Sequence, residues 1–337
     1  MKKKALLIVL VLIVIGGLAY WIVDSPDEPD TAQSNTNQND LIVYEFEAES
    51  QDDCTSIETF DAENSVCFFE CEDQAECDKL LAETEQELEQ YLQEYSDNSA
   101  NKEENVPQTQ DDIQSDADYS VTTGEAITLQ SGNNTPEHNT LWEQVSAISP
   151  DSLSDNYIET FRVFTAADDA TAAYVDDDDD DGKFVLAFNL SSHNDSSNQE
   201  QVLTIVHELA HIFTLNKDQI AQGTCEYETQ EGCFGNRSML AEFVEKFWSA
   251  QDRERAQNEA DLYTGNESNY VTQYASTNPE EDLAESFAYY VVRSDYSGSD
   301  IASQKQAFFD AYPEAVQAKQ DMRRATIQQF TRSRIAQ

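Results

Sequence analysis

The stretch that decides the fold is residues 197–215, which read SNQEQVLTIVHELAHIFTL. Ser197 with Glu200 three positions later is typical of a capping box, so a helix begins here. The residues that follow are apolar on almost every side of the helix, which predicts that the helix is buried. Asn216 is a residue at which such a helix can end. The sequence therefore predicts one long core helix.

This helix carries the sequence HELAH at residues 207–211. His207 and His211 lie four positions apart and so on one face, where two imidazoles can bind one metal ion at about 2.0–2.1 Å. Glu208 is next to the first of them and can reach a water molecule on the metal without binding the metal itself. The alternative is a pair of structural core histidines, which leaves the Glu208 carboxylate buried without a partner. The pattern therefore predicts one zinc ion per chain, with both histidines as ligands.

The third ligand must come from outside this helix. The other two histidines, His138 and His193, both precede the motif. No histidine follows His211, so the extended HExxHxxGxxH pattern is absent. The third ligand is therefore expected to be a carboxylate or a residue from a distant part of the chain.

Residues 280–292 read EEDLAESFAYYVV and are predicted to form a helix. Glu281 and Glu285 share one face of it, so one of them can bind the metal while the other accepts a hydrogen bond from a ligand histidine. Their spacing does not choose between the two roles. A solvated acidic face is the alternative, but Ala284 and Phe287 indicate that the helix packs inward.

The segment before and within this helix, residues 273–287, reads QYASTNPEEDLAESF. Together with the HELAH motif, it resembles gluzincin-type zinc metallopeptidases, in which HExxH is followed by a helix that supplies a glutamate. It is similar to the catalytic domain of anthrax lethal factor and to bacterial zinc-binding metallopeptidases with a Tyr-Ala-x-Thr-Asn-Pro-x-Glu-Asp-x-Ala-Glu-x-Phe pattern. The resemblance covers about residues 180–292 and implies a zincin-like metallopeptidase fold.

The resemblance implies a role for each matching residue. Glu281 is the expected third zinc ligand, and Glu285 is the expected hydrogen-bond partner of a ligand histidine. Glu208 is the expected general base, and Tyr274 is expected to stabilise the oxyanion. The chain departs from the family in the loop that holds residues 225–233, so the family's substrate preference does not transfer.

These residues predict a zinc-dependent endopeptidase that acts on a protein or peptide substrate. Glu208 would take a proton from a zinc-activated water molecule and pass it to the leaving amine. One alternative is a zinc amidase that acts on cell-wall material. The other is a non-catalytic surface binding protein on a relic protease fold, against which Glu208 argues because a site that only holds metal needs no base.

The charge of the chain restricts its partners. Its 337 residues include 19 Lys and Arg against 67 Asp and Glu, which gives a net charge of −48. The electrostatic field of so negative a chain repels the phosphate backbones of nucleic acids. Nucleic-acid binding is therefore excluded.

The N-terminal residues 1–23 contain three lysines and then the apolar sequence ALLIVLVLIVIGGLAYWIV. A helix of this length just spans a hydrocarbon layer of about 30 Å. Lysines on one flank and acidic residues on the other place the N-terminus inside and the rest of the chain outside. A single-pass anchor in the cell membrane is therefore expected, and the alternative is secretion after signal-peptide cleavage.

The six cysteines of the chain fit an oxidising compartment. Cys225 and Cys233 lie eight positions apart and are the expected local disulfide. The other four form a cluster without the C-x2-C spacing of structural zinc sites, so disulfides are expected there as well. These four are Cys54, Cys67, Cys71 and Cys77.

Composition and periodicity divide the chain into five parts and predict an α+β protein that is mostly helical with a small sheet. The parts are a transmembrane helix at 1–23, an acidic linker at 24–40, a small Cys-rich module at 41–95, a disordered linker at 96–136 and the metallopeptidase domain at 137–337. Within the last part, strands are predicted at 157–164 and 183–190, and helices at 141–148, 238–250, 280–292 and 302–330.

Overall fold

The computed structural model divides into two compact units, Met1–Asp40 and Leu41–Gln337, and all the residues that it describes lie in the second. The predicted membrane helix at 1–23 and the linker at 24–40 therefore lie outside the described residues. Among the described helices, none has the length and apolar content needed to cross a bilayer. The described residues are 42–47, 59–61, 66–71, 74–99, 113–122, 126–166, 171–177, 182–220, 224–229, 232–258 and 260–335.

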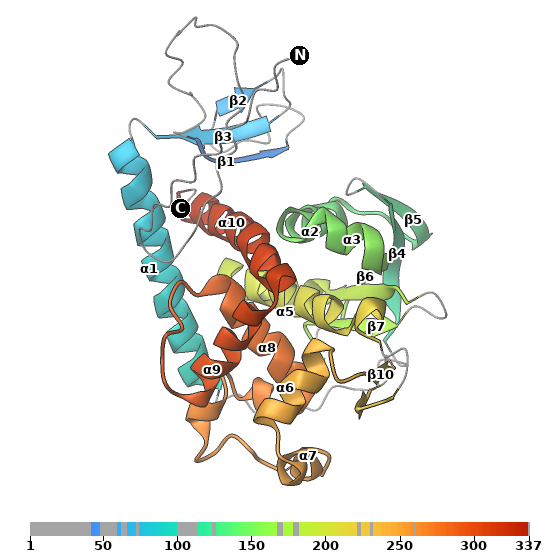
Figure 1. The fold of residues 1–337 in the computed structure, drawn as a ribbon. Coiled ribbons are helices and arrows are strands. Elements are labelled where there is room, and N and C mark those ends of the chain that lie inside the picture. The colour runs from blue at the N-terminus through green and yellow to red at the C-terminus, as the bar shows by residue number, and fades with distance from the viewer. Residues whose placement is uncertain are drawn as a thin grey trace, which may run out of the picture. The chain divides into compact units, whose positions relative to one another are not determined.

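A five-stranded mixed sheet organises this unit (Figure 1). Its strand order is β5-β4-β6-β8-β7, in which β6 and β8 are parallel and the other neighbours are antiparallel. The strands predicted at 157–164 and 183–190 are confirmed as β6 and β8. The strands of this sheet are β4 (Ser115–Thr122), β5 (Ala126–Gly132), β6 (Ile158–Phe164), β7 (Ala173–Asp177) and β8 (Phe184–Asn189).

Strands β4 and β5 lie within residues 96–136, which composition favoured as a disordered linker. β4 forms because alternate residues along it, Ala117, Tyr119 and Val121, are buried while those between them are polar. The strand lies between β5 and β6, and the Asp118 carboxylate accepts a hydrogen bond from Arg162 on β6 at 2.7 Å. The folded unit therefore begins well before residue 137. The rest of the predicted division into parts stays a prediction.

Helices make up most of the remaining unit, so the predicted α+β class with a mostly helical content is confirmed. The helices are α1 (Gln74–Ser99), α2 (Pro136–Ile148), α3 (Asp151–Tyr157), α4 (Leu190–Asp195), α5 (Asn198–Leu215), α6 (Met239–Phe247), α7 (Ala250–Ala256), α8 (Pro279–Val292), α9 (Ile301–Phe308) and α10 (Pro313–Ile335). Short 3-10 turns are η4 (Lys217–Gln219), η5 (Glu267–Asn269), η6 (Tyr274–Ser276) and η7 (Phe309–Ala311).

Two predicted helices are each divided in two by a residue that starts a new helix. The predicted helix at 302–330 is interrupted before α10, because Pro313 has no backbone N–H and its ring excludes the preceding turn of helix. The predicted helix at 238–250 ends at Phe247. Ser249 then caps α7 by accepting a hydrogen bond from the Asp252 amide.

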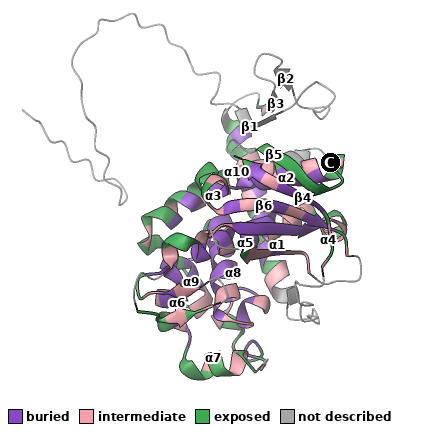
Figure 2. Cartoon of the chain, turned by 90° about the vertical axis from the view of Figure 1, so that its right-hand side faces the viewer, coloured by how far each residue is buried: buried purple, intermediate pink, exposed green. Residues whose placement is uncertain are grey.

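The main hydrophobic core lies between the sheet and α5, α8 and their neighbouring helices. Trp142 of α2 packs on Phe161 of β6 with ring centroids 5.0 Å apart, and Phe213 of α5 stacks on Phe287 of α8 at 4.9 Å. Figure 2 shows buried residues gathered on β6, α5 and α8, whereas α7 has no buried residue. Helices α5 and α8, which carry the predicted metal-site residues, are therefore both positioned by apolar contacts in the core.

Helix α1 packs against α10, and its Leu92 carbonyl accepts a hydrogen bond from Tyr289 near the end of α8 at 3.4 Å. Its apolar face joins the main core through Leu88 and Leu92. Two ion pairs lie beside this contact, Glu85 with Arg323 at 2.8 Å and Glu89 with Arg293 at 3.2 Å. The last part of the predicted Cys-rich module therefore contributes to the core that carries the site.

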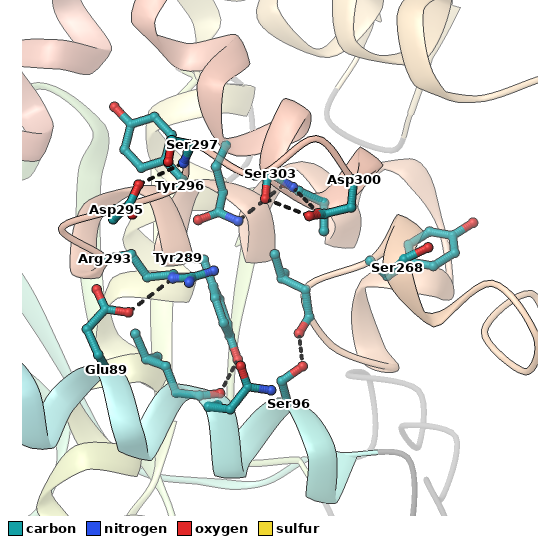
Figure 3. Close-up of a pocket in the computed structure, with 17 residues that line it drawn as sticks. Glu89, Ser96, Ser268, Tyr289, Arg293, Asp295, Tyr296, Ser297, Asp300 and Ser303 are labelled. Carbon is teal, nitrogen blue, oxygen red and sulfur yellow. Dashed lines mark hydrogen bonds and ion pairs between the residues drawn. The ribbon is translucent and has the colours of Figure 1, made fainter.

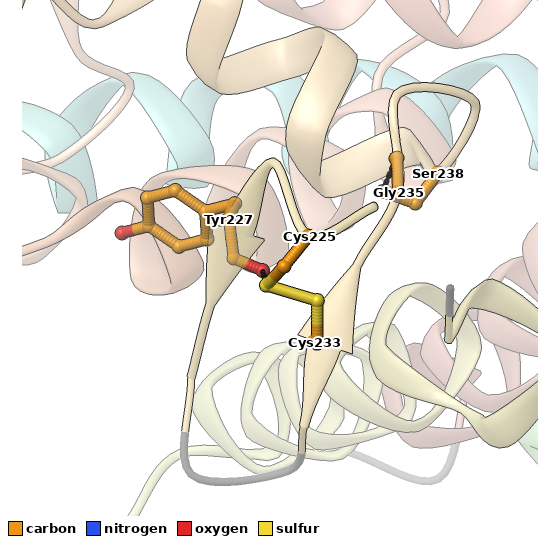
Figure 4. The surroundings of a disulfide bond; sticks show 5 residues. All are labelled: Cys225, Tyr227, Cys233, Gly235 and Ser238. Atoms are coloured by element: carbon orange, nitrogen blue, oxygen red, sulfur yellow. Dashed lines mark hydrogen bonds between the residues drawn. A yellow bond between two sulfur atoms is a disulfide. The ribbon is translucent and has the colours of Figure 1, made fainter. Parts of the chain in front are cut away.

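The local disulfide predicted between Cys225 and Cys233 is confirmed (Figure 4). It links Cys225, which precedes the short strand β9 (Tyr227–Glu228), to Cys233 of β10 (Cys233–Phe234), and the two strands pair as a hairpin. A second disulfide links Cys71 to Cys77, next to the three-stranded sheet of β1 (Ile42–Glu47), β3 (Val66–Glu70) and β2 (Thr59–Asp61). The predicted disulfides of Cys54 and Cys67 lie outside the described side chains.

Candidate metal centre

Helix α5 presents the two histidines of the motif on one face. It begins with the predicted capping box, in which Ser197 accepts from the Glu200 amide at 3.2 Å and Glu200 accepts from the Ser197 amide at 3.4 Å. Its core-facing residues are almost all buried, which fixes the rotation of the helix. The Nε2 atoms of His207 and His211 then lie 3.0 Å apart.

Helix α8 brings a carboxylate to the same point. Asn278 caps its N-terminus by accepting from the Glu281 amide at 2.8 Å, and Pro279 occupies the first turn, where a missing N–H costs nothing. This start places Glu281 in the first turn of the helix. Its Oε2 atom lies 3.2 Å from Nε2 of His207 and 3.2 Å from Nε2 of His211.

The three atoms form a triangle of the size that a single metal ion requires. With bonds of 2.0–2.1 Å and tetrahedral angles, ligand atoms should lie about 3.3 Å apart. The observed separations are 3.0, 3.2 and 3.2 Å. Among the described residues, His207, His211 and Glu281 are the cluster whose ligand atoms are close enough to share an ion. Two nitrogens and one carboxylate oxygen are a donor set that suits zinc.

Glu285 hydrogen-bonds to Nδ1 of His207, the ring nitrogen that does not belong to the triangle. One of its oxygens accepts from His207 Nδ1 at 2.7 Å, and the other accepts from the Thr272 hydroxyl at 2.6 Å. A carboxylate can only accept, so Nδ1 of His207 carries a hydrogen, and Nε2 is the ring nitrogen available to bind a metal. Thr272 was not predicted, because no sequence motif marks a hydroxyl that reaches a carboxylate thirteen residues away.

Glu208 and Tyr274 lie beside the triangle without belonging to it. Glu208 is only 5% exposed, and burial raises its pKa despite the opposing charges of His207 and His211. The Tyr274 ring lies 5.8 Å from the His207 ring, measured between centroids. Burial, together with the negative charges of Glu281 and Glu208, raises the pKa of Tyr274, so its hydroxyl keeps its proton.

The candidate ligand residues shift one another's pKa values. Burial opposes protonation of His207, but its hydrogen bonds to Glu281 and Glu285 outweigh burial and raise its pKa. Burial also opposes protonation of His211, and the charge of Glu281 raises the pKa there. Burial acts to raise the pKa of Glu281, yet the two histidines bring it below its ordinary value. A bound cation would replace the protons on the histidines, so metal binding is expected to release protons.

A buried ion pair fixes α8 on the side away from the triangle. Asp282, the residue after Glu281, is fully buried and lies 2.5 Å from Nζ of Lys305 on α9. Asp282 also accepts from the Trp248 indole at 2.7 Å, while Lys305 donates to the Asn269 carbonyl at 2.7 Å. Burial raises the pKa of Asp282 and lowers that of Lys305, and each charge offsets part of this effect on the other.

The remaining two histidines take no part in the centre. His138 is buried, and its Nδ1 lies 2.8 Å from the Tyr119 hydroxyl. His193 Nε2 lies 2.8 Å from Gln144 Oε1. Each therefore has a structural partner of its own, in line with a third ligand that is not a histidine.

The disulfide hairpin reaches the start of α8. The Tyr227 hydroxyl of β9 donates to Glu280 at 3.4 Å, and Glu280 precedes Glu281. Cys225 Sγ also lies 3.6 Å from the Tyr227 carbonyl oxygen (Figure 4). The disulfide-linked loop thus contacts α8, the helix that carries Glu281.

No family model, curated protein or solved structure matches this chain. The geometry of the described residues by itself indicates an HExxH-type site that could hold a metal ion.

Proposed function

We propose that this protein is a zinc-dependent metallopeptidase, and specifically an endopeptidase of gluzincin type. The observation that carries the proposal is the triangle of His207, His211 and Glu281 with Glu208 next to it on α5. A site that only stores metal has no need of a buried carboxylate beside the ligands, because burying such a group is costly.

A zinc ion held by the three ligands would lower the pKa of a water molecule and polarise a substrate carbonyl. Glu208 is suited to take a proton from that water and to give it to the leaving amine, because burial raises the pKa of its carboxyl above the ordinary value and makes it a stronger base. Tyr274 keeps its hydroxyl proton and can donate it in a hydrogen bond to the oxygen on which negative charge develops. Glu285 and Thr272 keep His207 in the tautomer that binds metal.

The compartment belongs to the same proposal. The disulfides Cys71–Cys77 and Cys225–Cys233 support an extracellular domain. The apolar residues 5–23, which follow three lysines, support a single-pass anchor with the N-terminus inside. The substrate is then a protein or peptide that reaches the outer face of the membrane.

The test is cleavage of a peptide library and of casein by the purified zinc-loaded chain. The wild type is expected to cleave peptide bonds, and Glu208→Gln is expected to bind zinc but to lose at least about 100-fold in kcat, since no base remains. Glu245→Gln, an exposed glutamate of α6, is the matched control and should retain activity. Cleavage of peptidoglycan but not of peptides would identify an amidase. Cleavage of neither by a chain that binds one zinc ion would favour a binding protein.

A further inference from the structure

Residues 271–278 lead into α8 and carry Tyr274 in the short turn η6. Both ends of this segment are fixed. At one end, Ser96 of α1 donates a hydrogen bond to the Val271 carbonyl at 2.7 Å (Figure 3). At the other end, Asn278 caps α8. The position of Tyr274 therefore depends on the contacts that the segment makes between these two points.

Thr272 makes two such contacts with one hydroxyl group. The residue is only 1% exposed. Its hydroxyl has a single hydrogen, which it donates to Glu285 Oε2 at 2.6 Å, because a carboxylate can only accept. The same oxygen accepts from the Ala275 amide at 3.1 Å. Ala275 follows Tyr274 within η6, so this hydroxyl joins the turn that carries Tyr274 to α8.

The other oxygen of Glu285 accepts from Nδ1 of His207 at 2.7 Å. Three successive hydrogen bonds thus run from the η6 backbone through Thr272 and Glu285 to the first ligand histidine. The ring of this histidine is also the one beside Tyr274, at 5.8 Å between centroids. A shift of either end would leave a buried polar group without its partner, which is costly. The series therefore favours one placement of Tyr274 relative to His207.

We propose that Thr272 is a positioning residue that sets Tyr274 relative to the metal ligand His207. It acts on each of them through one intermediate group, the Glu285 carboxylate on one side and the Ala275 amide on the other. The inference rests on the proposed peptidase function for its effect on turnover, whereas its effect on metal affinity requires no substrate.

The first test is zinc affinity, measured by competition with a chelator. Thr272→Val keeps the branched shape of threonine but lacks the hydroxyl, and it should weaken zinc binding about 10-fold, because Glu285 then holds His207 less firmly. Thr272→Ser keeps the hydroxyl and should stay within about 3-fold of wild type. The matched control is Thr326→Val, which removes a buried hydroxyl of α10 that has no hydrogen-bond partner among the described residues. It should bind zinc as wild type does.

The second test is peptide cleavage at saturating zinc. Thr272→Val should lower kcat at least about 10-fold with little change in KM, because the hydrogen bond from Tyr274 is needed only as charge develops on the substrate oxygen. The same substitution in Tyr274→Phe should lower kcat by less than about 3-fold, since the hydroxyl that it misplaces is already absent. General damage to the fold would lower kcat equally in both backgrounds. Thr272→Ser should restore turnover.

The outcomes that contradict the proposal are distinct from failure of the peptidase function. Wild-type zinc affinity in folded Thr272→Val would overturn the link to His207, and equal losses of kcat with and without the Tyr274 hydroxyl would overturn the link to Tyr274. If Thr272→Val does not fold, Thr272→Ala removes the same hydroxyl without adding atoms and gives the same comparisons. If the wild type cleaves no peptide, the peptidase function and the link to Tyr274 fail together, whereas the zinc affinities still decide whether Thr272 positions His207.

Discussion

Glu281 and Glu285 are chemically identical residues that one helical turn separates into different surroundings. Glu281 directs an oxygen at two histidine nitrogens, whereas Glu285 uses one oxygen for His207 Nδ1 and the other for Thr272. Both oxygens of Glu285 thus already have partners in hydrogen bonds. The surroundings of each carboxylate, rather than its type, separate a candidate ligand from a residue that orients a ligand.

This difference predicts unequal losses of metal affinity. Glu281→Gln should remove most zinc binding, because an amide oxygen is a poor ligand. Glu285→Gln should cost about 10–100-fold, because His207 keeps its place but loses its charged partner. The measurement is zinc affinity by competition with a chelator. Glu280→Gln changes the same charge on the same turn without touching the histidines, and it should bind zinc normally. If Glu285→Gln loses more affinity than Glu281→Gln, the two roles are reversed.

A pH prediction follows from His193. Burial lowers its pKa from 6.5 to about 4, so between these values the unfolded chain takes up a proton that the folded chain does not. Its contribution to stability is therefore complete above pH 6.5 and is lost as the pH falls toward 4. A shift of this size corresponds to at most about 3 kcal/mol.

The test of this effect compares wild type with His193→Gln, whose amide can still donate to Gln144 and does not titrate. The difference in their free energies of unfolding, measured by urea denaturation of metal-free protein, should move in favour of the variant between pH 7 and pH 4. All other titrating groups contribute equally to both proteins and cancel. A difference that stays constant over this range would refute the prediction.

At the scale of elements, α8 is fixed from both sides. Glu281 and Glu285 face α5, and Asp282 forms the buried pair with Lys305 of α9. Removing one partner of such a pair leaves an uncompensated buried charge. Lys305→Met should therefore lower the free energy of unfolding by about 3–5 kcal/mol.

The double variant Asp282→Asn with Lys305→Met removes both charges and should recover part of that loss. Lys319→Met is the control for loss of a lysine, since it removes a half-buried cation that does not contact Asp282. Urea unfolding of the four proteins measures these energies. A cost below about 1 kcal/mol for Lys305→Met would mean that the pair does not hold α8.

The start of α5, the Cys225–Cys233 disulfide and the shared face of His207 and His211 could be predicted because each depends on neighbouring residues, whereas Glu281, 70 positions from His211, was singled out only by the resemblance. The capping box of Ser197 and the i, i+4 spacing of His207 and His211 are local patterns, and both elements formed as expected. Thr272 and Lys305 could not be predicted, since their partners lie thirteen and twenty-three positions away on other elements. The strand β4 was missed because its polar alternate residues resemble those of a solvated linker.

At the scale of the whole molecule, the five-stranded sheet determines which truncated fragments of the chain can fold. A fragment of residues 137–337 contains every predicted metal ligand but lacks β4. Without β4, the backbone of β6 loses a partner strand and Phe161 loses its contact with Tyr119. We expect this fragment to unfold without cooperativity and to bind zinc poorly.

The fragment 41–337 is the matched control, because it keeps the complete compact unit. It should show one cooperative thermal transition and bind one zinc ion. Circular dichroism and metal analysis of the two fragments check this prediction. A 137–337 fragment that melts within a few degrees of 41–337 with one bound zinc would show that β4 and α1 are dispensable.

The packing of α1 on α10 also has a consequence for the order of events during synthesis. Thr84 bonds to Thr331, and Glu85 pairs with Arg323, so residues more than 230 positions apart must meet. Such long-range contacts form slowly, because closing a long loop must precede any gain from the contact. While ribosomes are still adding α10, α1 can contact the end of α8 but lacks the Arg323 and Thr331 partners of Glu85 and Thr84. The packing of α1 is therefore completed only after α10 (Pro313–Ile335) has been synthesised.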